Sequence, residues 1–189
     1  MSTLLIHDYL ERLSNLLRNE ARRTGSLHSL QPVHLEALHY LAVCNRYSNT
    51  PLAVAEFLGL TRGTVSQTLN VLDEKGLIAR EPDVKDKRVV HLCLTEAGTQ
   101  LLDSAVPAPL LQTAFGRLDK REQNQVAASL RNLLLACQAA NDMRSFGVCH
   151  TCRHNQRTAD GTYGTYWCGL TQEPLSAEDI TKICREHAA

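Results

Sequence analysis

The chain has 189 residues, its 20 lysines and arginines are balanced by 20 aspartates and glutamates, and 43% of its residues are hydrophobic. This length suits one medium domain or two small ones, and the composition is that of a folded protein rather than a disordered one. No stretch approaches the length of apolar residues that a membrane span needs, and the N-terminus lacks a secretory signal, so we expect a cytoplasmic protein with no membrane partner. Zero net charge argues against a protein that coats nucleic acid, but it allows a local basic surface.

Apolar residues at three- and four-residue intervals predict helices in the first half of the chain. Pro32 and Pro51 suit the first turns of two of them, and Thr61 can cap a third. Lys75 and Gly76 supply the basic residue and the glycine that typically end a helix. The predicted helices span about 5–24, 32–42, 52–58 and 62–75.

Two β-prone runs follow, residues 77–81 and 89–94, and they bracket a charged turn. A long helix is predicted from about Glu96, disturbed near Pro107 and Pro109. The pair Asp119 and Glu122 predicts the start of a last long helix by mutual capping. The helical period disappears after 144, so we place a module boundary there.

Two short helices joined at Gly59, followed by a hairpin with a charged tip, are the layout of a winged helix-turn-helix. In that layout the second helix reaches base edges in the major groove. Its candidate base-reading side chains are short polar groups and one cation: Thr61, Arg62, Thr64, Ser66, Gln67 and Asn70. Val65, Leu69 and Leu72 would face the core. A surface helix that is merely rich in threonine and serine is the alternative.

The wing resembles that of a known family. Residues 83–88 (DVKDKR) and 92–98 (LCLTEAG) are similar to the D-x-R-D-x-R…L-T-x-x-G signature of the MarR transcriptional regulators, and residues 60–66 and 75–78 fit the same family's recognition helix and its exit. The resemblance covers about residues 1–144. Lys85 departs from the pattern, because an arginine usually stands there; the charge is kept and the bidentate geometry is lost.

The resemblance implies a mainly α fold with a small β-hairpin wing: a winged helix-turn-helix whose DNA-reading part spans about 30–98, within a DNA-binding and dimerisation domain of residues 1–144. It implies a homodimer, held by the N-terminal and last two long helices, on a pseudo-palindromic site in double-stranded DNA. Arg88 would lie near a minor groove, and Lys85 and Lys87 would contact phosphates. Asp83 and Asp86 would hold the wing in shape by pairing with Arg88. Residues 61–91 contain six basic and five acidic residues. A basic DNA-binding face must therefore come from the way the basic side chains are placed, not from an excess of positive charge.

The seven cysteines fall into two groups. Cys44, Cys93 and Cys137 stand alone in apolar segments and are expected to be buried; a thiol sensor is the alternative. The other four lie in the Cys-rich segment 145–189, spaced C-x2-C-x15-C-x15-C: Cys149, Cys152, Cys168 and Cys184. Four thiolates suit tetrahedral Zn²⁺, but irregular spacing also suits an iron–sulfur cluster, and disulfides or free thiols stay open.

Other side chains of this module have weaker predicted roles. His150, His154 and His187 are spare candidate ligands, and Tyr163, Tyr166 and Trp167 are expected to form a small core or shield. Ser176 and Asp179 predict a short terminal helix that would deliver Cys184. The module is thus expected to bind a metal or a cluster.

From these features we expect a dimeric, sequence-specific transcriptional repressor, released by a small-molecule effector or by a change in the metal or redox state of the cysteine site. If a cluster is bound, its oxidation would change the spacing of the recognition helices. A metal or redox sensor that acts through a protein partner, with weak DNA binding, is the alternative. We expect no enzyme, because no G-x-S-x-G, H-E-x-x-H or phosphate-loop motif is present.

Overall fold

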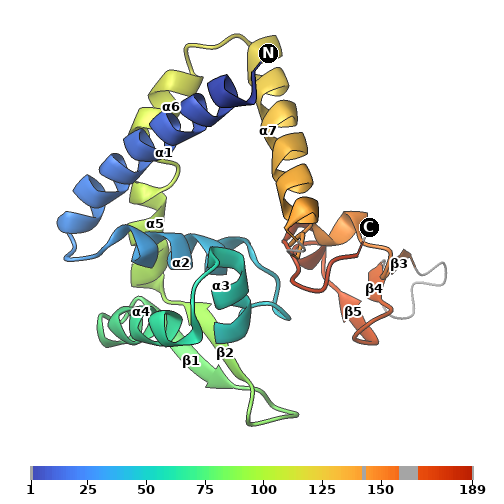
Figure 1. The fold of residues 1–189 in the computed structure, drawn as a ribbon. Helices are drawn as coiled ribbons and strands as arrows, with labels where there is room; N and C mark the ends of the chain where they lie inside the picture. Colours follow the sequence, from blue (N-terminus) through green and yellow to red (C-terminus); the bar gives the residue numbers. More distant parts are fainter. Residues whose placement is uncertain (1, 142–143, 158–165, 189) are drawn as a thin grey trace.

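The computed structural model describes residues 2–141, 144–157 and 166–188. Through residue 140 its helices and strands follow the predicted order, and three short strands that the sequence did not predict come after them. The helices are α1 (Thr3–Ser26), α2 (Pro32–Val43), α3 (Pro51–Leu58), α4 (Arg62–Glu74), α5 (Glu96–Ala105), α6 (Pro109–Phe115) and α7 (Lys120–Ala140). The strands are β1 (Ile78–Pro82), β2 (Val90–Leu94), β3 (Asn155–Arg157), β4 (Tyr166–Cys168) and β5 (Glu173–Leu175). In Figure 1, α1, α6 and α7 form an arch above a lobe made of α2–α5 and the β1–β2 hairpin.

Helix α2 is the centre of the hydrophobic core. Leu35, Ala37, Leu38 and Tyr40 are buried on it, and α3 and α4 add Val54, Val65, Leu69 and Leu72. The buried Tyr40 hydroxyl donates to the carbonyl of Ser48, 2.7 Å away. Burial and this hydrogen bond fix the loop that follows α2 against the helix.

The wing is confirmed as an antiparallel hairpin, in which β1 pairs with β2 and Arg80 lies opposite Leu92. The L-T-x-x-G part of the signature has a structural reason. Thr95 caps α5, and its hydroxyl donates to the carbonyl of Gly76 at 2.7 Å. A Cβ on Gly98 would stand 2.1 Å from the carbonyl oxygen of Leu77, so only glycine lets α5 approach the hairpin so closely.

The helix predicted from Glu96 is two helices in the structure, α5 and α6, with a break at residues 106–108. Proline restricts the residue before it and cannot donate to the helical ladder, which accounts for the break. The start of α7 is as predicted: Asp119 accepts from the amide of Glu122, and Glu122 accepts from the amide of Asp119, both at 2.8 Å.

The arch helices expose apolar side chains. Helix α7, all of whose residues are described, has no buried residue. Its exposed apolar residues are Val126, Leu130, Leu133, Leu134 and Leu135, and those of α1 include Leu4, Tyr9, Leu13 and Leu16. None of the described helices combines the length and the apolar character that a membrane crossing requires.

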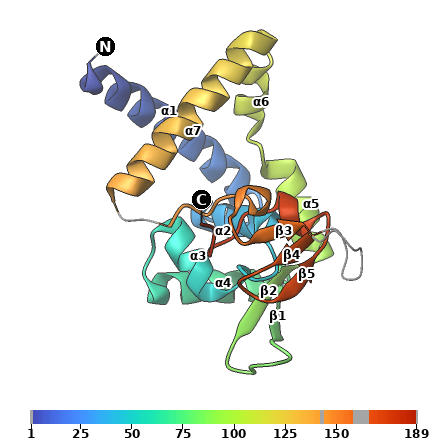
Figure 2. The ribbon, with the colours of Figure 1, turned by 90° about the vertical axis from the view of Figure 1, so that its right-hand side faces the viewer.

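The chain after 144 folds around a three-stranded sheet with the order β3-β4-β5. It also contains an extended strip, residues 182–184, that lies between two other stretches. On one side Asn45 donates to Ile183, and Ile183 donates to Val43; on the other side Cys184 donates to Gly147, with all three N···O distances at 2.9 Å. Figure 2 shows this module in front of α2 and the hairpin.

The terminal helix predicted from Ser176 and Asp179 is wrong in its extent. The two residues cap each other at 2.9 and 3.0 Å, but they begin a single 3₁₀ turn, Asp179–Thr181. The extended strip, not a helix, carries Cys184, because its backbone pairs with the neighbouring stretches. The domain boundary at 144/145 stays a prediction.

The three isolated cysteines differ from one another. Cys44 is buried, as predicted, and burial raises its pKa to about 12. Cys93 is half-buried, and burial raises the pKa of its thiol. Cys137 is exposed, so the prediction that it is buried is wrong for the single chain. It lies on α7, and no residue of this helix is buried by the described part of the chain.

Phe146 ties the segment after 144 to the core. Its φ of 45° turns the chain so that the ring packs edge-on against Tyr40 and Phe57, with centroids 6.0 and 5.2 Å away. We predict that Phe146→Ala lowers the free energy of unfolding by about 3 kcal/mol in a urea titration. Leu170→Ala, at a half-exposed position of the same module, should cost less than about 1 kcal/mol. Equal losses in the two variants would contradict the packing described for Phe146.

Candidate nucleic-acid interface and cysteine cavity

Helix α4 presents one polar face and one apolar face. Val65, Leu69 and Leu72 are buried, as predicted. All six candidate base-reading residues are exposed: Thr61, Arg62, Thr64, Ser66, Gln67 and Asn70. The helix therefore turns its polar face outward over its first turns, as a helix that reads a groove must.

Two of these six residues also have local structural roles. The Thr61 hydroxyl caps α4 by accepting from the amide of Thr64 at 3.2 Å. The Asn70 side chain accepts from Arg80 at 2.6 Å, and Arg80 also pairs with Asp73 at 2.9 Å. Asn70 is thus held by the wing strand β1, which fixes the angle between the helix and the hairpin.

Asp83 organises the base of the wing turn. One carboxylate oxygen accepts from the amides of Lys85 and Asp86 at 2.8 and 2.7 Å, and the other lies 3.1 Å from the His91 ring. The backbone amide of Asp86, then His91, hold the pKa of Asp83 below its usual range. His91 in turn lies 2.6 Å from the side-chain oxygen of Asn49. Sequence reasoning missed His91 and Asn49, because nothing local links residues 42 positions apart.

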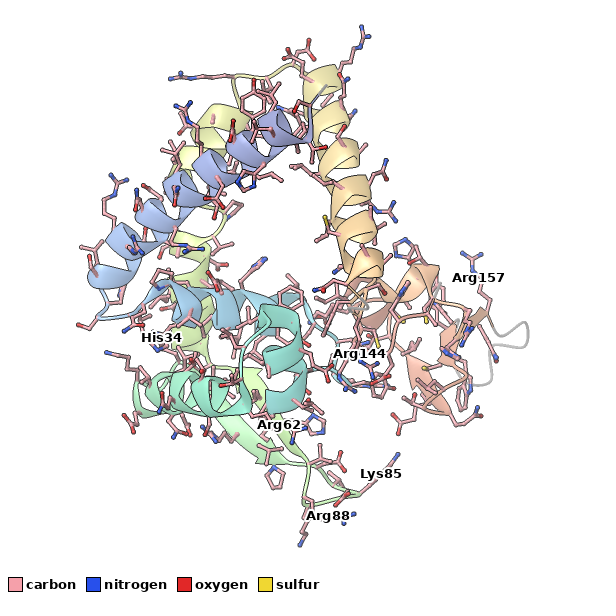
Figure 3. All side chains as sticks on the ribbon, in the orientation of Figure 1. His34, Arg62, Lys85, Arg88, Arg144 and Arg157 are labelled. Carbon is pink, nitrogen blue, oxygen red and sulfur yellow. The ribbon has the colours of Figure 1, made fainter. Side chains whose placement is uncertain are left out.

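The tip of the wing carries Arg88. Its guanidinium makes two contacts of 3.0 Å with the Asp86 carboxylate, and its side chain is 91% exposed. The pair with Arg88 lowers the pKa of Asp86. Arg88 thus pairs with Asp86, whereas Asp83 holds the turn through the backbone. Figure 3 shows Arg88 at the lower end of the molecule, on the side to which the lobe also presents Arg62.

Lys85 has a partner that the sequence did not reveal. Its ammonium forms an ion pair with Glu173 of strand β5, and the pair raises the pKa of Lys85 and lowers that of Glu173. Figure 3 shows Lys85 directed toward the module, away from Arg88. Glu173 also accepts from the Tyr47 hydroxyl at 3.0 Å, and Arg46 donates to the carbonyl of Pro174 at 2.5 Å. Lys87 is exposed.

The four module cysteines line one small cavity of about 30 Å³. All four are free thiols in the structure. Burial, and next the nearby Cys184, Cys152 and Cys168, raise the pKa of Cys149 to about 12. Among residues 2–141, 144–157 and 166–188, however, no three histidine, cysteine or acidic side chains stand as a ready-made metal-binding group. The structure therefore brings the four thiols to a common cavity without closing them into a coordination shell.

The spare histidines separate into different environments. His154 lines the cysteine cavity, and His150 is exposed. The His187 ring contacts the hydroxyls of Ser145 and Thr151 at 3.1 and 3.0 Å, so both of its nitrogens are engaged away from the thiols. Of the predicted aromatic core residues, Tyr166 and Trp167 are half-buried, and Tyr163 lies outside the described residues.

An exposed polar helix after a glycine turn, with a charged wing beside it, defines a winged-helix DNA-binding protein. Comparison with known proteins agrees. The MarR family model matches residues 28–89. The chain is 31% identical over 137 residues to the HTH-type transcriptional regulator YkoM of Bacillus subtilis, covering 65% of this chain and 86% of YkoM. It is 25% identical over 135 residues to the HTH-type transcriptional repressor NicR of Pseudomonas putida, covering 68% of this chain and 85% of NicR.

Among solved structures, the complex of S. aureus MepR with DNA is 27% identical, with a TM-score of 0.57, and the match covers 70% of this chain and 98% of MepR. The chain belongs to the MarR family and is a DNA-binding transcriptional regulator.

Replacing Asp83 allows a test in which its charge and its structural role predict opposite changes in DNA affinity. Asp83→Ala removes a negative charge near DNA, which by itself would strengthen binding. Because Asp83 holds the turn, we predict that DNA affinity falls about tenfold, measured by fluorescence anisotropy. Glu81→Ala removes the same charge from an exposed position of the same hairpin and should leave the affinity unchanged or raise it. Tighter binding by Asp83→Ala would contradict the structural role.

Proposed function

We propose that the chain acts as a homodimeric repressor that binds a pseudo-palindromic operator, and that it works through this binding rather than through catalysis. The observation that carries the proposal is the spatial separation of two surfaces. The polar face of α4 and the exposed Arg88 lie on one side of the lobe, and the unpartnered apolar side chains of α1 and α7 lie on the arch at the other end (Figure 1).

The exposed apolar side chains of α1 and α7 indicate that a second copy of the chain binds to the arch. Exposed large apolar side chains recur along both α1 and α7, and a contiguous apolar surface of this kind marks an interface. A two-fold dimer joined there would present two α4 helices, and two-fold proteins read operators with matching symmetry. Similarity to NicR, a transcriptional repressor, supports repression.

The dimer can be tested on α7. Leu130 and Leu134 are four residues apart and are 48% and 58% exposed. We predict that the double variant Leu130→Glu/Leu134→Glu is monomeric at micromolar concentration by size-exclusion chromatography with light scattering, whereas wild type and Gln125→Glu are dimers. A monomeric wild type would refute this arrangement.

Operator binding can be tested at the wing tip. Arg88→Ala should weaken binding to an operator selected from a random library by roughly 10- to 100-fold, while the dimer stays intact. Val84 lies on the same turn and is 95% exposed without charge, so Val84→Ala is the matched control and should bind as wild type does. Undiminished binding by Arg88→Ala would refute the wing's part in recognition.

A further inference from the structure

The four cysteines that line the cavity come from three separate segments of the module. Cys149 begins a 3₁₀ turn and Cys152 follows it, Cys168 ends β4, and Cys184 lies on the extended strip. Segments so far apart in sequence enclose a single small space. Rotation of a cysteine about χ1 moves its sulfur between staggered positions without moving the backbone, and a shared ion requires such rotations to bring the four sulfurs together.

Polar groups around this cavity point to an occupant. The Asn45 side chain is 1% exposed, lines the cavity, and its Nδ2 has no hydrogen-bond acceptor within the described part of the chain. This buried N–H donor cannot ligate a cation, but it can donate to a cysteine thiolate, which is the acceptor that a metal-bound cysteine would supply. The amide of Ala188 already donates to the sulfur of Cys152 at 3.5 Å. Metal-bound thiolates are stabilised by such donors.

The cavity has room for a small occupant. Its volume of about 30 Å³ holds one or two water-sized species, which is enough for a single ion. The module itself has three strands of three residues each, and so small a unit usually needs a metal or disulfides to be stable.

We propose that Cys149, Cys152, Cys168 and Cys184 bind one thiophilic divalent cation of the class of Zn²⁺, and that the filled site holds Glu173 against Lys85 of the wing. Four thiolates around one ion satisfy the tetrahedral preference of zinc. The ion would join the CxxC turn, β4 and the strip, each of which contacts the DNA-binding lobe or supports a residue that does.

One connection runs through β4 and β5. Cys168 lies directly opposite Glu173 in the antiparallel register, so an ion held by Cys168 fixes the strand pair that positions the Glu173 carboxylate. Glu173 then holds the ammonium of Lys85. A second connection runs through the strip, because Arg185, next to Cys184, contacts Glu56 of α3 at 2.6 and 2.7 Å and donates its amide to Ser48 at 2.8 Å.

The consequence for DNA rests on the proposed function. Lys85 lies on the wing, where a cation would neutralise a phosphate, and Glu173 competes with that phosphate for the same ammonium. The metal-filled module therefore restrains DNA binding. Loss of the ion, or of the carboxylate, frees Lys85.

Metal content tests the site without DNA. Full-length protein, purified without added metal and then titrated with Zn²⁺ alone, should hold about one zinc per chain by mass spectrometry of the metal. Cys168→Ser and Cys184→Ser should lose it, and Cys137→Ser should keep it. A wild-type chain that takes up no zinc, that holds iron and sulfide with visible absorption, or that forms disulfides instead would overturn the site.

Amine labelling tests the link to the wing, also without DNA. In the zinc-loaded protein an acylating reagent should modify Lys85 more slowly than the neighbouring Lys87, as followed by mass spectrometry. Glu173→Gln, or removal of zinc, should accelerate Lys85 by about two- to fivefold and leave Lys87 unchanged, as expected for an exposed ion pair. Labelling of Lys85 that responds to neither change would overturn the link.

On DNA, zinc-loaded Glu173→Gln should bind more tightly than zinc-loaded wild type, with a log–log salt dependence steeper by about 1.8, the value for two additional phosphates, one for each Lys85 of the dimer. Removing zinc from Glu173→Gln should change its DNA affinity only slightly, because Lys85 is already free in this variant. Equal salt dependence in the two proteins would overturn the restraint. If neither protein bound DNA, the proposed function would fail, while metal content and labelling would still decide the inference.

Discussion

The loop between α2 and α3, residues 44–50, is the constraint on which the rest of the structure depends. The Ser48 carbonyl of this loop accepts from the buried Tyr40 hydroxyl, which fixes the loop to the core. The amide of Asn45 donates to Ile183, and the Ser48 hydroxyl accepts from the amide of Arg185. On the opposite side, the Asn49 carbonyl accepts from the amide of Leu92 at 2.7 Å. One short loop therefore joins the hydrophobic core, the C-terminal strip and the wing strand, so a displacement of one reaches the others through direct hydrogen bonds.

The proposed zinc site would connect the cysteine module to DNA binding through this loop. In Figure 1 the module lies beside the lobe that carries α4 and the wing, rather than at the far end of the arch. Under the coupling proposed above, a change in the module would act first on the wing, through Glu173 and the 44–50 loop, and would need no movement of the arch helices. This differs from the sequence-based expectation that a cysteine-bound cluster would act by altering the spacing of the recognition helices.

Local features of the fold were predictable because local chemistry determines them. Thr61, Asp119 with Glu122, and the glycine after Lys75 mark helix ends through caps that involve neighbouring residues. The spacing of the apolar residues in α4 predicted which face of the helix is buried and therefore which face is exposed. The pairs Lys85–Glu173, Glu56–Arg185 and Asn49–His91 join residues 88, 129 and 42 positions apart, and no local pattern encodes them. The expected burial of Cys137 failed for a related reason, since an apolar helix period does not say whether the same chain or another copy covers it.

The most direct test of this coupling is hydrogen exchange on the full chain, with the cysteine site loaded with Zn²⁺ and after the zinc has been removed. The account predicts that removal accelerates exchange in the module and also at the amides of Asn45 and Leu92, which bond to Ile183 and Asn49. Faster exchange confined to residues 144–188, with the loop and the wing strand unchanged, would contradict it.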